Sequence, residues 1–334
     1  MSFIEKMKEE AKKDIKTIVL PESEDLRILE ATQEVLKEGF ANIILIGDSE
    51  NINNLAKENN IDLTGAQIIN PRTSTNLSRY SSDLYELRKN KGMTLEQAQE
   101  LLMKNSRYFA TMMVKEGDAD GFVSGAANPT SDTLRPALQI LKTAPGTKLV
   151  SAFFIMCIPD CDYGEDGVFV FADCGLNEYP DAEALSEIAI SSSKSFEELI
   201  GSTPKVAMLS YSTYGSAHSP LTEKVIEATR LLKEKCPDLI CDGEIQLDAA
   251  IVPEVATRKA PNSPLKGEAN ILIFPDLDAG NIGYKLTQRF GKAEAYGPLC
   301  QGVARAVNDL SRGCSSKDIV GVVAITAVQA QHIN

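Results

Sequence analysis

The sequence lacks the short motifs that most readily identify a nucleotide-binding or hydrolytic enzyme. It contains no G-x-x-x-x-G-K-[ST] motif, no G-x-G-x-x-G motif after an expected strand and no G-x-S-x-G motif. These absences argue against a P-loop kinase, a standard dinucleotide site and an α/β-hydrolase. The chain has only two histidines, His218 and His332. His332 lies near the C-terminal end and His218 in a loop where hydrogen bonding is its commoner role, so histidine-based acid–base catalysis has few candidates.

Metal-binding and membrane-spanning patterns are also missing. The seven cysteines include no C-x-x-C pair, which favours buried free thiols in a reducing compartment over a zinc site. No run of about 18 apolar residues occurs, and the charged N-terminal segment has no signal-peptide pattern, so we expect a cytoplasmic protein. Carboxylates at strand ends are more often turn residues and helix caps than metal ligands, so no metal site is predicted. The carboxylates considered are Asp242, Glu244, Asp248, Asp276 and Asp278.

Positive charge is scarce. The chain carries 34 Lys and Arg against 47 Asp and Glu, a formal net charge of −13. The field of the whole molecule therefore repels nucleic acid and anionic membranes. An anionic small molecule remains a possible substrate where local arginines override that field.

The hydrophobic pattern predicts an α/β fold. Continuous apolar, β-branched runs are typical of strands buried in a mainly parallel sheet, and segments of helical periodicity lie between them. The expected strands are residues 16–21, 40–46, 68–69, 149–158, 168–172, 206–210 and 271–274. The expected helices run from Ser23 to Gly39, from Thr94 towards Glu116, and over 182–195, 222–235, 301–310 and 316–331.

Two turn-rich stretches divide this pattern into two α/β domains. Residues 143–146 and 296–298 contain Pro and Gly between regular segments, and they mark the crossings between domains. The first domain is predicted to comprise residues 1–145 and 297–334, with its last helices returning from the second domain, residues 146–296. Ligands in such folds bind at the carboxyl ends of strands or between domains, which favours the loops at 124–135, 210–219 and 275–284.

The segment 308–320 is the most informative. Ser311 and Arg312 stand in a short loop before an apolar helix that begins near Ser316. A helix N-terminus with a guanidinium and a hydroxyl beside it forms an anion pocket. The alternative is that Ser315 caps the helix and Asp318 is a first-turn acid that favours the helix dipole.

The chain resembles one known family over almost its full length. The matching segments are 18–24, 119–126, 133–136, 242–250, 270–276, 279–285, 288–289 and 308–318. In this order they resemble phosphate acetyltransferases, also called phosphotransacetylases. The residues of each segment alone are common in many proteins, but all of the segments together in this order are specific for the family.

The resemblance implies both a fold and a reaction. The implied fold is that of the isocitrate and isopropylmalate dehydrogenases, two α/β domains with a cleft between them, usually as a homodimer. The implied substrates are coenzyme A, acetyl phosphate and phosphate, with no metal and no tightly bound cofactor. The family's catalytic aspartate falls on Asp318, its serine on Ser311 and its essential arginine on Arg312, while Arg88 and Arg135 fall on the positions that bind coenzyme A.

Further binding candidates lie in the loops favoured above. They are Ser124, Ser131, Thr133, Asn281, Lys285 and Arg289. Lys285 and Arg289 are four residues apart, which is also the spacing of a solvated basic helix face. Cys314 falls where the family often has a reactive but non-essential cysteine.

The implied reaction needs a base for the thiol, a donor for the developing oxyanion and positive charge for phosphate. We expect Asp318 to take the thiol proton, Arg312 to bind the carbonyl oxygen or phosphate, and Ser311 to donate a hydrogen bond. Three alternatives stay open. They are a phosphate butyryltransferase, a metal- and nicotinamide-dependent decarboxylating dehydrogenase on the implied fold, and a non-catalytic regulatory domain.

Overall fold

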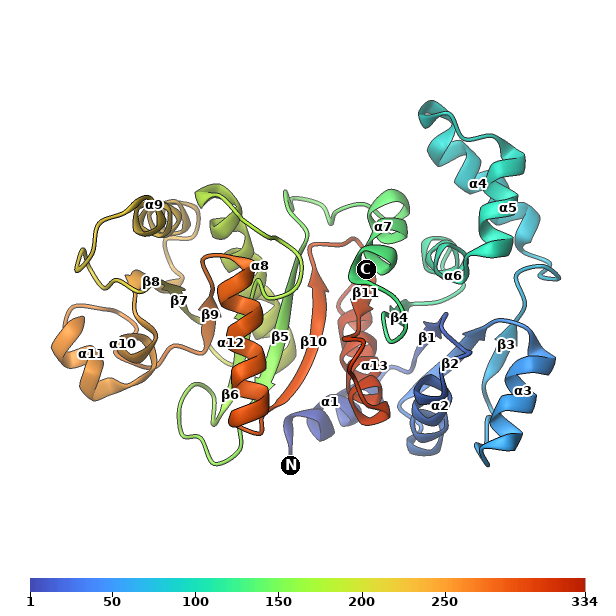
Figure 1. Ribbon diagram of the computed structural model, residues 1–334, viewed down its shortest axis with the longest axis horizontal. Coiled ribbons are helices and arrows are strands. Elements are labelled where there is room, and N and C mark those ends of the chain that lie inside the picture. Colours follow the sequence, from blue (N-terminus) through green and yellow to red (C-terminus); the bar gives the residue numbers. More distant parts are fainter. Residues whose placement is uncertain (334) are drawn as a thin grey trace. The chain divides into compact units, whose positions relative to one another are not determined.

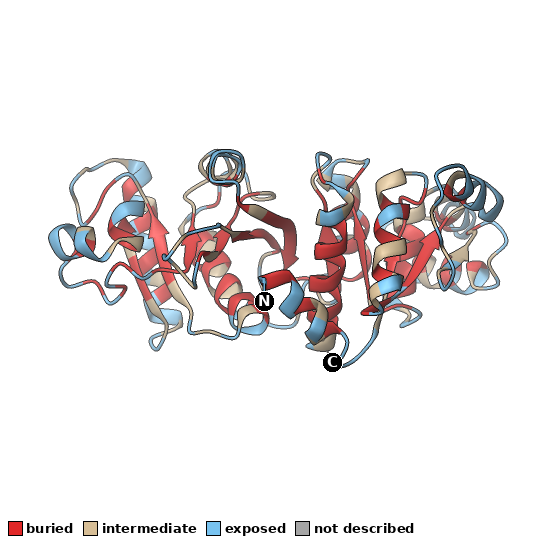
Figure 2. Ribbon diagram, turned by 90° about the horizontal axis from the view of Figure 1, so that it is seen from below, coloured by how far each residue is buried: buried red, intermediate tan, exposed pale blue. Residues whose placement is uncertain are grey.

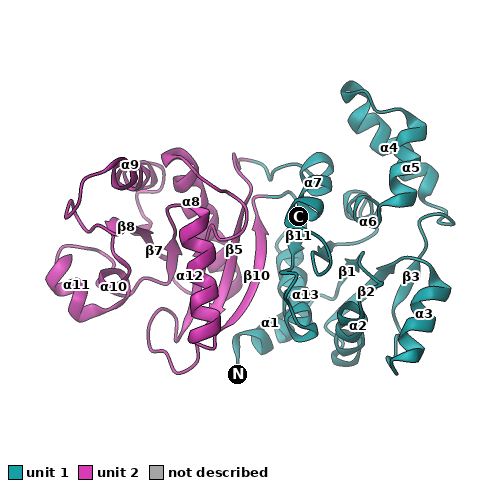
Figure 3. Ribbon diagram, viewed as in Figure 1, with its two compact units in different colours: residues 1–145, 303–334 teal, residues 146–302 magenta. Residues whose placement is uncertain are grey.

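The computed structural model describes residues 1–333 and resolves the chain into two compact units. Unit 1 comprises Met1–Pro145 and the chain from Val303 onward, and unit 2 comprises Gly146–Gly302 (Figure 3). Strands alternate with helices along the chain, and most strand neighbours are parallel (Figure 1). The predicted α/β fold is confirmed.

Unit 1 holds a parallel sheet in the order β3-β2-β1-β4-β11. Its strands are β1 (Lys16–Leu20), β2 (Ala41–Ile46), β3 (Gln67–Ile69), β4 (Gly121–Ser124) and β11 (Ala306–Asp309). Its helices are α1 (Phe3–Ala11), α2 (Leu26–Glu38), α3 (Ser49–Glu58), α4 (Leu77–Arg88), α5 (Leu95–Lys104), α6 (Ser106–Lys115), α7 (Thr130–Ile140) and α13 (Ser316–Gln331), with a short 3-10 turn η1 (Lys89–Lys91). β4 and β11 are buried along their whole length, so neither shows the alternation of buried and exposed residues expected of a half-exposed strand.

Helix α13 lies at the centre of unit 1. It packs against β1, β4 and β11 and against α1 and α2, and every residue from Ile319 to Val328 is buried (Figure 2). A helix that is apolar on all sides is typical of such a position. The site loop that precedes α13 is therefore fixed to the most buried helix of the unit.

Unit 2 holds a mixed sheet in the order β10-β5-β6-β9-β7-β8, in which β5 is antiparallel to both of its neighbours. Its strands are β5 (Ser151–Cys157), β6 (Val168–Ala172), β7 (Lys205–Leu209), β8 (Ile240–Ile245), β9 (Ile271–Ile273) and β10 (Glu294–Gln301). Its helices are α8 (Ala182–Ile200), α9 (Pro220–Lys235), α10 (Leu247–Ile251), α11 (Pro253–Lys259) and α12 (Leu277–Phe290).

Three sequence predictions about helices were wrong, and one predicted domain boundary differs. The segment 301–310 is not a helix: it contains the end of β10 and all of β11, and a short apolar run buried on both faces does not reveal its period. Because β10 pairs with β5, unit 2 runs to Gly302 rather than to residue 296. The expected helix from Thr94 to Glu116 is two helices, because Asn105 ends α5 and its side chain caps α6. Asp25, not Ser23, caps α2.

No helix within residues 1–333 is both long enough and apolar enough to cross a lipid bilayer.

Candidate active site

The candidate site of unit 1 is built on three neighbouring parallel strands. β1, β4 and β11 lie side by side, so their carboxyl ends meet at one edge of the sheet. The loops that follow them are residues 21–25, 125–129 and 310–315. In open α/β sheets this edge is where ligands bind.

A buried glutamate binds the middle loop. Glu22, which is 7% exposed, accepts hydrogen bonds from the backbone N–H groups of Gly125 at 2.7 Å, Ala126 at 2.8 Å and Ala127 at 3.3 Å. Asn128 Nδ2 donates to the same carboxylate at 2.6 Å. Four donors around one carboxylate fix the conformation of this loop.

Arg27 connects all three loops. Its Nη1 donates to the carbonyl oxygens of Arg312 and Cys314, both at 2.9 Å. Its Nη2 donates to Ala126 O at 2.7 Å and to Asp25 Oδ2 at 2.6 Å. The hydrogen bond from Arg27 also lowers the pKa of Asp25. Arg27 is thus a positioning residue of the site.

Asp309, at the end of β11, is the second buried carboxylate of the site. It is 0% exposed, and its Oδ2 accepts a hydrogen bond of 2.6 Å from Thr130 Oγ1 at the start of α7. Burial raises the pKa of Asp309 to about 7, and the charge of Glu22 adds to the rise while the hydroxyl of Thr130 opposes it. The Asp309–Thr130 hydrogen bond joins the strand that leads to Ser311 with the helix that follows the β4 loop.

Two of the predicted catalytic residues, Ser311 and Arg312, lie in the loop between β11 and α13, and the third, Asp318, lies in the first turn of α13. Ser311 Oγ accepts a hydrogen bond of 3.3 Å from the N–H of Gly313. Arg312 is exposed. Asp318 Oδ2 accepts from Ser315 N at 2.8 Å and from Ser315 Oγ at 2.9 Å, and Ser315 Oγ accepts from Asp318 N at 3.2 Å. The capping role considered for Ser315 and Asp318 is present, and the catalytic role of Asp318 stays a prediction.

Several arginines of unit 1 have no acidic partner. The Nε atoms of Arg88 and Arg107 are buried and make no hydrogen bond within residues 1–333. Across the same residues, none of the ion pairs includes Arg88, Arg107, Arg135 or Arg312. Buried guanidinium N–H groups without a partner in the protein suit an anionic ligand.

Two of these arginines lie near Tyr108 on α6. Burial raises the pKa of Tyr108, and the positive charges of Arg135 on α7 and Arg88 on α4 oppose that rise. The Tyr108 hydroxyl donates to Gln139 Oε1 at 2.8 Å. The structure therefore brings the two predicted coenzyme A arginines to one region of unit 1.

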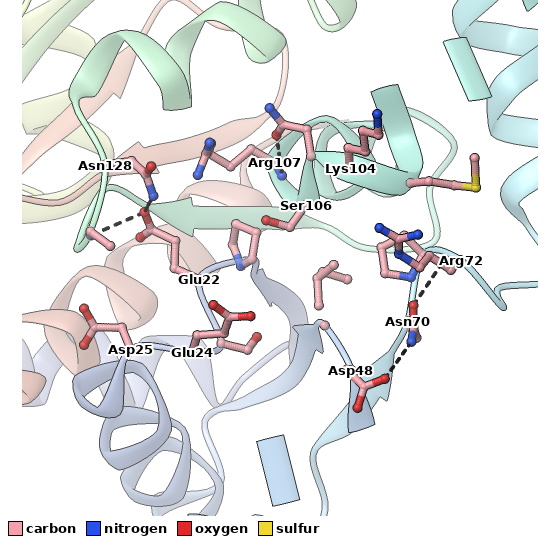
Figure 4. A pocket seen from close by; sticks show the side chains of 18 residues that line it. Glu22, Glu24, Asp25, Asp48, Asn70, Arg72, Lys104, Ser106, Arg107 and Asn128 are labelled. Atoms are coloured by element: carbon pink, nitrogen blue, oxygen red, sulfur yellow. Dashed lines mark hydrogen bonds between the residues drawn. The ribbon is translucent and has the colours of Figure 1, made fainter. Parts of the chain in front are cut away.

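A cavity of about 610 Å³ adjoins the loops that follow β1 and β4. Glu22, Asp25 and Asn128 line it on the side of the site, and further lining residues follow β2 and β3 or lie at the start of α6. Figure 4 shows the side chain of Arg107 extending toward Asn128. The cavity is of the size that holds a nucleotide-sized ligand.

Of the remaining predicted binding residues, Ser124 and Thr133 lie beside Asp309, and three others belong to unit 2. Ser124 and Thr133 are fully buried, while Ser131 on α7 is exposed. The other three lie on α12 of unit 2: Asn281 Nδ2 donates to Cys174 O at 3.2 Å, Lys285 Nζ donates to Tyr284 Oη at 2.9 Å, and Arg289 is exposed.

Sequence reasoning missed Glu22, Arg27 and Asp309. The sequence around each of these three residues nevertheless carries a signal of its role. Glu22 and Asp309 directly follow or end apolar runs that form buried strands. Arg27 stands in the first turn of a helix, where positive charge opposes the helix dipole, and such a local inconsistency indicates a role outside the helix.

Cys314 is a buried thiol rather than an exposed nucleophile. Burial raises its pKa to about 11, although Arg27 opposes the rise. We therefore expect iodoacetamide at pH 7.5 to alkylate Cys314 at least about 100-fold more slowly than it alkylates glutathione, because only the thiolate reacts. Peptide-resolved mass spectrometry measures this rate, and unfolding in urea should abolish the protection. Alkylation of the folded protein as fast as glutathione would contradict the assignment.

Within residues 1–333, no cluster of three or more His, Cys, Asp or Glu side chains is arranged to hold a metal ion.

An arginine-rich site at the carboxyl edge of a parallel sheet defines a class of protein that handles phosphorylated substrates. The family described as "Phosphate acetyl/butaryl transferase" matches residues 2–327. A phosphate acetyltransferase of Acetivibrio thermocellus is 64% identical over 100% of this chain and 99% of its own length.

Solved structures agree. The EutD phosphotransacetylase from Staphylococcus aureus is 46% identical, with a TM-score of 0.88 over 98% of both chains. A phosphotransacetylase from Streptococcus pyogenes is 42% identical, with a TM-score of 0.92 over 99% of this chain and 100% of its own. The chain belongs to the phosphate acetyl/butyryl transferase family, and the resemblance read from its sequence is confirmed.

Proposed function

We propose that this enzyme catalyses the reversible transfer of an acetyl group between coenzyme A and phosphate, acetyl-CoA + phosphate ⇌ acetyl phosphate + CoA. The observation that carries the proposal is the pair of buried guanidinium Nε atoms, of Arg88 and Arg107, that make no hydrogen bond within residues 1–333, with Arg107 lining the cavity beside the loops that follow β1 and β4. Both substrates are rich in phosphate oxygens, which guanidinium groups bind in pairs of hydrogen bonds. Relatives that match the whole chain are phosphate acetyltransferases.

The loop before α13 supplies the proposed chemistry. The thiol of coenzyme A attacks the carbonyl carbon of acetyl phosphate, Asp318 takes the thiol proton, and phosphate leaves. Arg312 stabilises negative charge on the carbonyl oxygen or on the phosphate, and Ser311 donates a hydrogen bond to the tetrahedral intermediate. Arg27 supports this arrangement because it binds the carbonyl oxygens of Arg312 and Cys314.

Proton transfer in this step has to be concerted with attack. In water an aspartate and a thiol have pKa values near 3.9 and 8.5, so full transfer costs roughly 6 kcal/mol. Oδ2 of Asp318 accepts two hydrogen bonds from Ser315, which hold the carboxylate in place. Asp318 therefore acts as the thiol attacks, without releasing a free thiolate.

The proposal also covers substrate-binding residues in both units, cofactors, location and assembly. Arg88 and Arg135 bind phosphate groups of coenzyme A, and Asn281, Lys285 and Arg289 contribute from unit 2. The enzyme needs no metal or tightly bound cofactor and acts in the cytoplasm. It forms a homodimer, which is supported by the exposed apolar side chains of Ile282, Leu286 and Phe290 on α12, since one helix face of this kind suits burial against a second copy.

Thioester formation from acetyl phosphate and coenzyme A, followed at the thioester absorbance, tests the reaction and its substrates together. Parallel assays with butyryl phosphate decide between acetyl and butyryl transfer. The rates have to be compared quantitatively, because one methylene changes selectivity only about 10- to 200-fold. Activity should survive excess EDTA, and nicotinamide cofactors should not be turned over. Absence of thioester formation with every acyl phosphate tested would reject the proposal.

Replacing Arg135 or Arg88 with glutamine should raise the KM for coenzyme A by about 10-fold or more, with a smaller effect on kcat, because uniform binding energy is lost. Steady-state kinetics with acetyl phosphate held in excess measure this split. Arg79→Gln is the matched control, since Arg79 on the same helix as Arg88 already pairs with Asp118. A fall in kcat at unchanged KM would contradict a binding role.

A further inference from the structure

Helices α4 and α5 project as a pair from the sheet of unit 1 (Figure 1). They pack against each other and against α6. Arg88 is the last residue of α4, and its positive charge acts on Tyr108 of α6. A guanidinium group at the end of a projecting helix binds a ligand well only if the helix is held in place beforehand. The contacts of α4 therefore decide where Arg88 lies.

Tyr80 joins α4 to α6 and to the turn that follows α6. Its side chain is fully buried, and its ring packs edge-to-face on that of Phe109 on α6, with 5.2 Å between the ring centroids. Its hydroxyl donates a hydrogen bond to Asp118 Oδ2. Burial raises the pKa of Tyr80, and the hydrogen bond to Asp118 adds to the rise. The hydroxyl therefore keeps its proton and remains a donor.

Asp118 lies in the turn between α6 and β4, and this turn is fixed to the sheet. The backbone N–H of Asp118 donates to Met113 O at 2.9 Å. Two residues further on, Asp120 N donates to Thr17 O at 2.9 Å, and Asp120 Oδ2 accepts from Thr17 N at 2.7 Å, in the second residue of β1. The Tyr80 hydroxyl therefore connects α4 with the strands that carry the site loops.

Arg79 pairs with the same oxygen of Asp118, but the side chain of Arg79 is 46% exposed. An ion pair in solvent contributes little to stability. A hydrogen bond from a buried side chain to a charged acceptor contributes more. The attachment of α4 therefore depends on Tyr80 rather than on Arg79, and Arg79→Gln keeps its use as a control.

We propose that Tyr80 and Asp118 are positioning residues that fasten α4 to the turn before β4 and thereby hold the Arg88 guanidinium where it binds a phosphate group of coenzyme A. The inference rests on the proposed function, because Arg88 has this role only if coenzyme A is a substrate. Without the Tyr80–Asp118 hydrogen bond, α4 occupies further positions. The apparent affinity for coenzyme A then falls in proportion to the fraction of molecules in the binding position.

Replacing Tyr80 with phenylalanine keeps the buried ring and removes the hydrogen bond. Tyr80→Phe should raise the KM for coenzyme A by about 3- to 10-fold, the effect of one hydrogen bond on an equilibrium constant, and leave kcat within about 2-fold of wild type. Asp118→Ala should act in the same direction, and the double variant should be no worse than Asp118→Ala alone. Tyr85→Phe is the matched control, because it removes from the same helix a hydroxyl that does not bond Asp118.

Two readouts separate positioning from a general loss of stability. In an Arg88→Gln background, Tyr80→Phe should cause no further rise in KM, because the group that it positions is gone. Independently of activity, hydrogen exchange of the amides of residues 77–88 should be faster in Tyr80→Phe than in wild type, while exchange in α13 stays unchanged.

Two sets of results decide the matter. An equal rise in KM with and without Arg88, or an unchanged KM or unchanged exchange in Tyr80→Phe, would overturn the inference. Wild type that forms no thioester, together with faster exchange of α4 in Tyr80→Phe, would reject the proposed function but support the fastening of α4 by Tyr80.

Discussion

Replacing Asp318 with asparagine is expected to lower kcat for thioester formation by about 10²- to 10⁴-fold, the usual contribution of a general base. Asparagine can still accept the hydrogen bonds from Ser315 that cap α13, but it cannot take a proton. The KM values should change little, since the interaction develops only as the thiol attacks. Steady-state kinetics at pH 7.5 measure both parameters.

Ser315→Ala is the matched control for Asp318→Asn. It removes the side chain that caps α13 and leaves the Asp318 carboxylate in place. The expected cost is about 1 kcal/mol of stability, with kcat reduced only a few-fold. If both variants lost the same activity, Asp318 would be acting as a helix cap and not as a base.

Replacing Glu22 with glutamine is expected to destabilise unit 1 by about 3 kcal/mol or more. The carboxylate accepts four hydrogen bonds, whereas a glutamine has one acceptor oxygen and turns its amide protons toward backbone N–H groups. Charged hydrogen bonds of this kind contribute about 1.5–3 kcal/mol each. The thermal midpoint should fall by roughly 6–12 °C for a unit of this size.

Glu24→Gln serves as the control for charge. Glu24 is exposed in the same loop, and its replacement should change stability by no more than about 0.5 kcal/mol. Differential scanning calorimetry of both variants separates the loss of hydrogen bonds to the β4 loop from the loss of one negative charge. Equal midpoints for Glu22→Gln and wild type would show that Glu22 does not hold the β4 loop.

Local sequence signals predicted many elements of the fold. The capping box of Thr94 and Gln97 begins α5 as expected, and Gly39 ends α2 in the left-handed conformation. The segment 301–310 was misread because it holds only the end of β10 and the four-residue β11, which is buried on both faces and too short to show a strand period. Asn105 was overlooked because a cap between two helices leaves their apolar patterns continuous.

The predicted site was found through resemblance rather than through local pattern. Ser311, Arg312 and Asp318 lie within eight consecutive residues, so their position at the loop before α13 and in the first turn of that helix follows directly. The supporting residues are distant in sequence: Arg27 and Arg312 are joined by a hydrogen bond across 285 positions. Nothing local predicts such a contact, because it depends on the order of strands in the sheet.

The acidic composition did not exclude an anionic substrate. The net charge of −13 repels polyanions over distance, but screening limits that field to about 8–10 Å at physiological salt. Within that range we expect Arg88 and Arg107, whose buried Nε atoms make no hydrogen bond within residues 1–333, to attract phosphate groups. We therefore expect the charge of these arginines, and not the net charge of the chain, to govern the binding of phosphate groups.

The pH dependence of Asp318→Asn tests the base assignment most directly. Without a base, the variant depends on thiolate that forms in solution, so its kcat/KM for coenzyme A should rise about tenfold per pH unit from pH 6.5 to about 8.5, the pKa of a free thiol. Wild type should show a much shallower rise, and the two rates should approach each other at high pH. A deficit that stays constant over this range, or a variant as active as wild type at pH 7, would contradict proton removal by Asp318.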